Sequence, residues 1–201
     1  MQIVVPDLDV ASRELADVHG LTALAGGHHP GRGTANKIVP LGGAYLELIT
    51  VIDRDEAARN DISFVLDSLD RGWRFAAWAL RSQDLETDAA LFHDASVETV
   101  GPLDGSRQRP DGSVLRWRSL HPAGRNLAMP FLIEWEVEHG QHPGEQAVEH
   151  RSGTVRFRGI DLVSPQPEAV KAVLDDSMTY SVELGPESRI VAVHLTNGTI
   201  R

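Results

Sequence analysis

The stretch Ile3-Val4-Val5-Pro6-Asp7-Leu8 decides the fold, because an apolar strand passes directly into a helix there. Asp7 occupies the position of an N-cap residue, whose side chain accepts hydrogen bonds from the first N–H groups of a helix. Gly20 stands where a glycine commonly ends a helix. Between these two residues, apolar side chains recur at helical spacing at Leu8, Ala11, Leu15 and Val18. The sequence therefore predicts a strand followed by a capped helix.

The same order of strand and capped helix occurs twice more. A strand-like run at 75–80 leads to a helix from Asp84, and a run at 154–163 leads to a helix whose entry contains two prolines. The first two helices are each followed by strand-like runs with glycine or proline turns between them. Residues 1–52 and 73–138 thus both follow the order β-α-β-β-β, which indicates a duplicated module.

The remaining segments join or extend these modules. Residues 53–72 are a charged connector with one short helix, and the polar residues 138–153 are typical of a linker. Residues 154–201 form a shorter third unit that begins like the other two. We therefore expect an α+β fold with one domain over residues 1–138 and a C-terminal β-α-β extension, 154–201, that packs on the same domain.

The composition excludes several classes of protein. The 201 residues contain no cysteine and carry a formal net charge of −10. A disulfide scaffold, a thiol nucleophile and a thiolate metal site are therefore excluded. Apolar runs such as 45–52 are far shorter than the ~18 residues of a membrane helix, and an acidic surface disfavours nucleic acid. We expect a soluble cytoplasmic protein with no membrane or nucleic-acid partner, since no secretory leader opens the sequence.

Glu47 interrupts an apolar strand, Tyr45-Leu46-Glu47-Leu48-Ile49. Alternate residues of a strand face opposite sides of a sheet, so Glu47 shares its face with Tyr45 and Ile49. Both faces are apolar, which predicts a buried carboxylate. Such a group needs a metal, a base or a hydrogen-bond donor. The alternative is an ion pair with Arg116 or Arg118 of a neighbouring strand.

Glu134 lies on the corresponding last strand of the second module. Phe131, Ile133 and Trp135 form one face of that strand, while Glu134 and Glu136 lie on the other. This clean alternation is equally consistent with an acidic face in solvent and with a functional carboxylate.

The segment 26–36, Gly-Gly-His-His-Pro-Gly-Arg-Gly-Thr-Ala-Asn, is unusually rich in glycine. It lacks the spacing of a nucleotide-binding loop, so its first interpretation is an irregular surface loop with exposed histidines. In the second interpretation His29 acts in a site, because its ordinary pKa near 6.5 suits proton transfer. Asn36 then follows on a strand that enters the sheet. We expect His139, His142 and His150, in the polar linker, to be solvated.

Several motifs together resemble the glyoxalase-like domain family of the vicinal-oxygen-chelate superfamily. They cover most of the chain in order: Val5-Pro6-Asp7-Leu8, the segment 26–36, Tyr45-Leu46-Glu47-Leu48, 109–118 and 130–135. The resemblance implies paired β-α-β-β-β modules that form a concave mixed sheet, which agrees with the duplication described above.

The resemblance also implies a divalent metal such as Mn, Ni, Zn or Mg. Ligands in this superfamily come from the first and last strands of each module, which points to Glu47 and Glu134 as metal ligands here. The ligand set is incomplete, because relatives place a histidine just before the first strand, at a position that precedes Met1 in this sequence.

Three functions are consistent with these features. The first is a metal-dependent lyase or isomerase, in which Glu47 and His29 are catalytic and Asn36, Arg116 and Arg118 bind the substrate. The second is a metal-free protein that binds or sequesters a small molecule in the same sheet. The third is an interface for a partner, such as a second copy in a homodimer. The fold alone does not choose among them.

Overall fold

A computed structural model describes residues 1–59, 63–72, 74–124, 126–138, 140–174 and 178–201. The described chain divides into two compact units, each assembled from three segments. Unit 1 comprises Met1–Ala76, Ser106–Arg116 and Val137–Arg156. Unit 2 comprises Ala77–Gly105, Trp117–Glu136 and Phe157–Arg201. The expected division into residues 1–138 and 154–201 stays a prediction.

The predicted α+β class is confirmed. The described strands form a mixed sheet of nine, in the order β5-β1-β4-β3-β2-β7-β8-β9-β6, and a second sheet of four, in the order β11-β10-β12-β13. The first module follows the expected β-α-β-β-β order. In the second module the single expected helix is two short helices.

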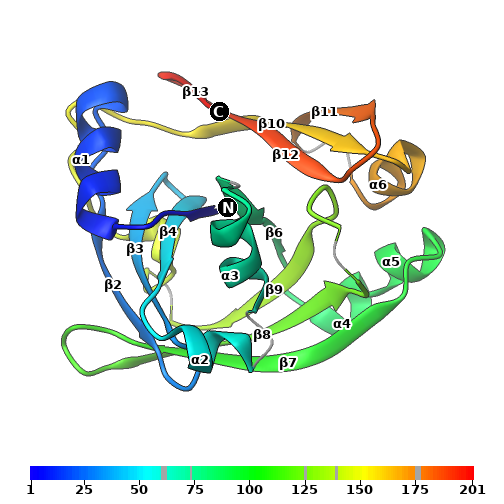
Figure 1. The fold of residues 1–201 in the computed structure, drawn as a ribbon, viewed down its shortest axis with the longest axis horizontal. Coiled ribbons are helices and arrows are strands. Elements are labelled where there is room, and N and C mark those ends of the chain that lie inside the picture. The colour runs from blue at the N-terminus through cyan, green and yellow to red at the C-terminus, as the bar shows by residue number, and fades with distance from the viewer. Residues whose placement is uncertain (60–62, 73, 125, 139, 175–177) are drawn as a thin grey trace. The chain divides into compact units, whose positions relative to one another are not determined.

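Unit 1 holds the first module and its connector (Figure 1). Its elements are β1 (Gln2–Val4), α1 (Leu8–His19), β2 (Leu24–His29), β3 (Thr34–Pro40), β4 (Tyr45–Val51), α2 (Arg54–Ala58), α3 (Ser63–Asp70) and the 3-10 helix η1 (Pro143–Glu145). The strands β5 (Phe75–Ala77), β7 (Thr99–Gln108) and β8 (Val114–Pro122) contain points where the chain passes from one unit to the other.

The helix α1 begins and ends as its capping residues predict. The Asp7 carboxylate accepts hydrogen bonds from the N–H groups of Asp9 and Val10, and Gly20 ends the helix with a left-handed φ of 66°. Ala11 and Leu15 are buried, which confirms the apolar stripe. The stripe does not extend to Val18, which is 74% exposed because it lies in the last turn, beyond the part of the helix that packs on the sheet.

The face of β1 and β4 that carries Val4 and Ile49 packs on α3. Val65 of this helix joins both strands in one buried apolar cluster, and Phe64 and Leu69 pack against it. The helix expected in the connector is therefore present as α3, but the prediction of a single helix there is wrong, because α2 precedes it. Glu47 lies on the same face of β4 as Ile49, two residues away, so the site begins where this apolar cluster ends.

Unit 2 holds most of the second module and the C-terminal elements. These are β6 (Ala79–Arg81), α4 (Leu85–Asp88), α5 (Ala90–Asp94), β9 (Phe131–Glu136), β10 (Phe157–Ser164), α6 (Pro167–Val173), β11 (Thr179–Leu184), β12 (Arg189–Leu195) and β13 (Gly198–Ile200). Asp84 caps α4 by accepting from the N–H of Thr87, as predicted. Trp78 is buried and its Nε1 donates to the carbonyl of Ala128 at 3.2 Å, so this tryptophan belongs to the core.

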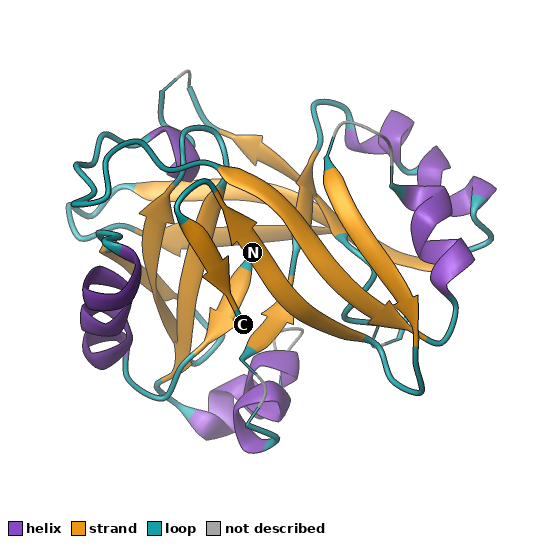
Figure 2. Ribbon diagram, turned by 90° about the horizontal axis from the view of Figure 1, so that it is seen from above, coloured by secondary structure: helices purple, strands orange, loops and turns teal. Residues whose placement is uncertain are grey.

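Figure 2 shows the strands of the fold in orange, and the last of them, at the C-terminus, belongs to the four-stranded sheet. A row of polar side chains crosses this sheet. Ser181 Oγ donates to Asp161 Oδ1 at 2.7 Å, and His194 Nε2 lies 2.8 Å from Asp161 Oδ2. His194 Nδ1 is joined to Thr199 Oγ1 at 3.0 Å. The hydrogen bond from Ser181 is the largest cause that lowers the pKa of Asp161. The row thus links all four strands through one carboxylate.

Replacing this carboxylate is expected to destabilise the protein. Asp161→Ala should lower the free energy of unfolding at pH 7 by about 1–2 kcal/mol, because Ser181 and His194 lose their acceptor. The difference from the wild type should shrink in acid, since a carboxyl with a lowered folded pKa stabilises above its unfolded value of about 3.9 and stops doing so below its folded value. Urea unfolding over a range of pH measures both effects. Glu187→Ala, at an exposed position, is the control, and equal losses in the two variants would contradict the prediction.

Candidate functional site

Glu47 is buried at the centre of unit 1, as its strand pattern predicts. Glu47 is only 8% exposed. Its strand, β4, lies between β1 and β3, and Glu47 is directly opposite Gln2 on one side and Ile38 on the other. Gln2 Nε2 donates to Glu47 Oε2 at 3.1 Å. The predicted alternative of an ion pair with Arg116 or Arg118 is not among the described contacts of Glu47.

Asn36 connects Glu47 to two further groups. Its Nδ2 donates to Glu47 Oε1 at 2.5 Å and also lies 3.3 Å from His29 Nε2. Its Oδ1 accepts from Arg107 Nη1 at 3.2 Å. One side-chain amide therefore joins a carboxylate, an imidazole and a guanidinium. We call Gln2, His29, Asn36, Glu47 and Arg107 the polar cluster.

His29 lies on a strand and is 5% exposed, so the first interpretation of segment 26–36 as an irregular surface loop is wrong for its first half. Residues 26–29 continue β2, and the turn begins only at Pro30. The glycines allow close approach of neighbouring strands rather than a loop. His29 Nε2 lies 3.7 Å from Glu47 Oε1.

The protonation state of His29 follows from its surroundings. Burial lowers the pKa of His29 to about 4, against the opposing effect of the Glu47 carboxylate. Arg107 and Arg32 lower this pKa further. Because Asn36 Nδ2 is a donor, Nε2 of the neutral ring accepts, and the ring proton lies on Nδ1, 2.8 Å from Thr34 Oγ1. His29 is therefore a neutral imidazole at pH 7.

Gly26 is needed for the cluster to close. A Cβ at this position would lie 2.1 Å from Asn36 Oδ1 and 2.6 Å from Arg107 Nη1. Any larger residue would therefore push apart the two groups whose hydrogen bond joins β3 to β7.

Arg107 and Gln2 belong to the cluster but are missing from the residues predicted as site residues. Arg107 is only 2% exposed. It stands in the run Gly105-Ser106-Arg107-Gln108-Arg109, whose glycine and mixed polarity hide the strand alternation that revealed Glu47. Gln2 gives no signal of its own, because its role depends on the parallel pairing of β1 with β4.

The other predicted site residues lie elsewhere. Arg116 is exposed on β8. Arg118, in unit 2, forms an ion pair with Glu134 and donates from Nη1 to Glu86 Oε1 at 2.7 Å. The hydrogen bond to Glu86 is the first of the causes that raise the pKa of Arg118. The metal-ligand role of Glu134 and the substrate-binding roles of both arginines stay predictions.

The expectation of solvated linker histidines is wrong for His142 and His150, and His139 lies outside the described residues. His142 is 3% exposed, accepts from the N–H of Gly144 and packs its edge on Tyr45 with ring centres 5.7 Å apart. His150 accepts from the N–H of Thr22 and donates to the carbonyl of Pro40. Both rings complete the hydrogen bonding of backbone that would otherwise lack partners, which fixes the segment on unit 1.

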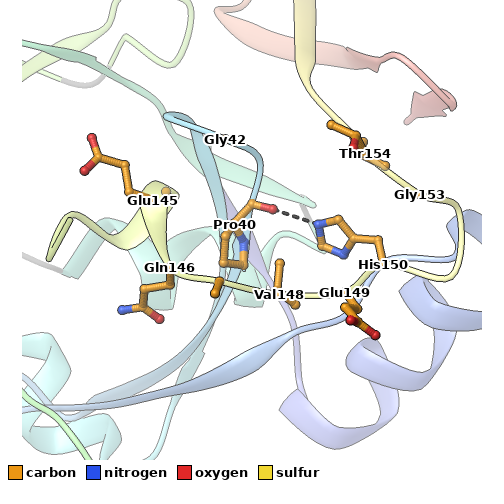
Figure 3. A pocket seen from close by; sticks show the side chains of 12 residues that line it. Pro40, Gly42, Glu145, Gln146, Val148, Glu149, His150, Gly153 and Thr154 are labelled. Carbon is orange, nitrogen blue, oxygen red and sulfur yellow. Dashed lines mark hydrogen bonds between the residues drawn. The ribbon is translucent and has the colours of Figure 1, made fainter.

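A pocket of about 490 Å³ lies beside this segment (Figure 3). Its walls come from the β3–β4 hairpin at Pro40 and Gly42 and from residues 144–150 and 153–155. The hydrogen bond from His150 to Pro40 closes one side of it. None of the predicted site residues lines this pocket, so it is separate from the polar cluster.

The polar cluster does not fit a resident divalent metal by itself. Glu47 supplies one carboxylate and His29 one imidazole, and the described residues contain no group of three or more acidic, histidine or cysteine side chains arranged for a metal. The guanidinium of Arg107 would also repel a cation. Hard and borderline metals need more converging ligands than these two.

A family model described as "Glyoxalase-like domain" matches residues 1–178. The chain belongs to the glyoxalase-like domain family. The resemblance predicted from the sequence motifs is thereby confirmed. No curated protein matches the sequence.

The chain is also similar to solved structures. A hypothetical protein from Staphylococcus aureus is 18% identical with a TM-score of 0.75, covering 96% of this chain and 88% of its own. A methylmalonyl-CoA epimerase from Mycobacterium tuberculosis is 20% identical with a TM-score of 0.46, covering 67% of this chain and 83% of its own. A Streptomyces coelicolor methylmalonyl-CoA epimerase variant in complex with 2-nitronate-propionyl-CoA is 18% identical with a TM-score of 0.49, covering 68% and 94%.

The helices of the described residues also bear on the membrane prediction. None of them has the length and hydrophobicity that a membrane crossing requires.

The protonation of His29 can be tested by titration. An imidazole with a folded pKa near 4 binds its proton more readily after unfolding, where the pKa is about 6.5. The free energy of unfolding should therefore fall as the pH drops from about 6.5 to about 4. NMR of the ring should show the neutral form at pH 5, and His29→Gln should flatten this part of the stability profile. Protonation of His29 near pH 6.5 in the folded protein would contradict the assignment.

Gly26→Ala tests the close approach in the cluster. We expect a loss of about 1–3 kcal/mol in the free energy of unfolding, because the new Cβ displaces Asn36 and Arg107. Gly31→Ala is the comparison, since a Cβ there meets no neighbouring atom and costs only the strain of its positive φ. A smaller loss for Gly26→Ala than for Gly31→Ala would show that the cluster tolerates the extra atom.

Proposed function

We propose that the protein binds a small molecule against the polar cluster and that Glu47 accepts a proton from it, in a lyase or isomerase reaction. The observation that carries this proposal is a buried carboxylate held by side-chain amides. Asn36 donates to one carboxylate oxygen and Gln2 to the other. Each oxygen keeps a further lone pair, so Glu47 is oriented and can still accept a proton.

His29 supports the same chemistry. Its neutral Nε2 lies 3.7 Å from Glu47 Oε1 and has its lone pair on the side of the cluster. That lone pair accepts a hydrogen bond from Asn36 Nδ2, so the ring takes up a proton from Glu47 when this hydrogen bond opens. The low pKa of His29 makes the imidazole a brief carrier rather than a final acceptor, which suits a relay that returns the proton to the ligand.

A second candidate is binding without chemistry. The same buried donors and acceptors can hold a small polar molecule, and burial strengthens each hydrogen bond. The buried Gln2 Oε1, which has no hydrogen-bond partner among the described residues, supports binding of a ligand that donates a hydrogen bond. This candidate and the first share the site but differ in whether a proton leaves the ligand.

Hydrogen exchange separates these two candidates. The protein is incubated in D₂O with small 2-oxo and 2-hydroxy carbonyl compounds, and NMR follows exchange of the C–H next to the carbonyl carbon. We expect exchange that falls about 100-fold or more in Glu47→Gln, because the general base is lost. Glu14→Gln, at an exposed position on α1, is the control and should retain the wild-type rate.

Other outcomes of the same assay are equally informative. An unchanged rate in Glu47→Gln would remove Glu47 from the chemistry, and saturable binding with no exchange would favour the binding protein. Because the cluster alone does not fit a metal, we expect chelator treatment to leave the rate unchanged. Loss of exchange with chelator and its return with Mn, Ni, Zn or Mg would instead favour the metal-dependent reaction.

A further inference from the structure

Arg107 is a buried cation whose charge is matched only indirectly. Its residue is 2% exposed, and its described hydrogen bond runs from Nη1 to the neutral Oδ1 of Asn36. Burial of a charged group costs several kcal/mol unless an opposite charge and further hydrogen bonds compensate. Burial is also the largest of the effects that lower the pKa of Arg107. A buried charge with this cost is expected to have a function.

The opposite charge that compensates Arg107 is the Glu47 carboxylate, and the Asn36 amide links the two side chains. The two opposite charges act on each other, but Asn36 stands between them and bonds to both. A guanidinium has five N–H donors, and one of them is used in the bond to Asn36. The arrangement therefore holds the carboxylate and the guanidinium apart, and it leaves Arg107 with donors for a third group.

The charge around the cluster is opposite to that of the whole chain. The protein has a formal net charge of −10. Yet Arg109 is close enough to lower the pKa of Arg107, and Arg32 to lower that of His29. Arg109 Nε is buried and has no hydrogen-bond partner among the described residues. Positive charge is thus concentrated where the acidic background would otherwise repel an anion.

We propose that Arg107 recognises a carboxylate of the small molecule on which Glu47 acts, so that the ligand is an organic acid. This inference rests on the proposed function and adds the class of its ligand. The planar guanidinium matches a carboxylate with two parallel hydrogen bonds, which a neutral amide cannot accept in the same way. Asn36 then positions both Arg107 and Glu47 on one ligand, one for its charge and one for its proton.

The test compares acids with their neutral amides. Acetate, lactate and pyruvate are titrated against the full chain beside acetamide, lactamide and pyruvamide, and NMR follows the Nε–H of Arg107. We expect the acids to bind and to shift this signal, with the amides about tenfold weaker or more. Equal binding of acids and amides, or binding of neither, would overturn the proposal.

Variants decide whether Arg107 carries the preference. Arg107→Met should remove the preference for acids, and Arg107→Lys, which keeps the charge without the fork, should retain part of it. Arg107→Lys also keeps the test valid if the methionine variant fails to fold, as thermal unfolding will show. Arg13→Gln, an exposed arginine on α1, is the control and should bind like the wild type. A full preference for acids in Arg107→Lys and Arg107→Met alike would overturn the assignment.

The two proposals can fail separately. If acids bind through Arg107 but Glu47→Gln leaves hydrogen exchange unchanged, the ligand class holds and the proton transfer is wrong. If exchange depends on Glu47 while neutral compounds bind as well as acids, the proton transfer holds and the role of Arg107 is wrong.

Discussion

The side-chain amide of Asn36 is the contact on which the site of unit 1 depends. It accepts from Arg107 and donates to Glu47, so it keeps a buried cation and a buried anion near each other without letting them meet. A direct ion pair would satisfy both charges and leave little for a ligand. The amide instead stabilises each charge in part, and we propose that this partial compensation leaves the cluster able to bind a ligand.

Features set by local chemistry could be predicted from the sequence. Capping needs only a side chain and the N–H groups next to it, so the sequence correctly predicts Asp7 and Asp84 as N-cap residues. Strand alternation is equally local, and it correctly predicts that Glu47 is buried. The family could also be predicted, because its motifs occur in order along the chain, and a family model matches residues 1–178.

Features set by distant contacts could not be predicted. Arg107 joins the cluster through a residue 71 positions away, and no local pattern indicates such a partner. His142 looked solvated because its neighbours in sequence are polar, although its burial depends on Tyr45 of β4. Glycine misled in another way. The glycines at 26 and 27 predict a loop, since glycine is common in turns. Gly26 instead lies on a strand, and glycine is needed there because Asn36 and Arg107 come too close for a Cβ.

The interleaving of the two units has a consequence for how the protein can be divided. Each unit consists of three separate segments, so the chain passes between them five times. No single cut releases either unit as one continuous piece, and a truncation at any of the three inner crossings, after residues 105, 116 and 136, removes parts of both. A recombination event that exchanges one end of the gene at an inner crossing would therefore replace pieces of both units. Diversification of such a protein has to proceed by substitution within the sheet rather than by shuffling of domains.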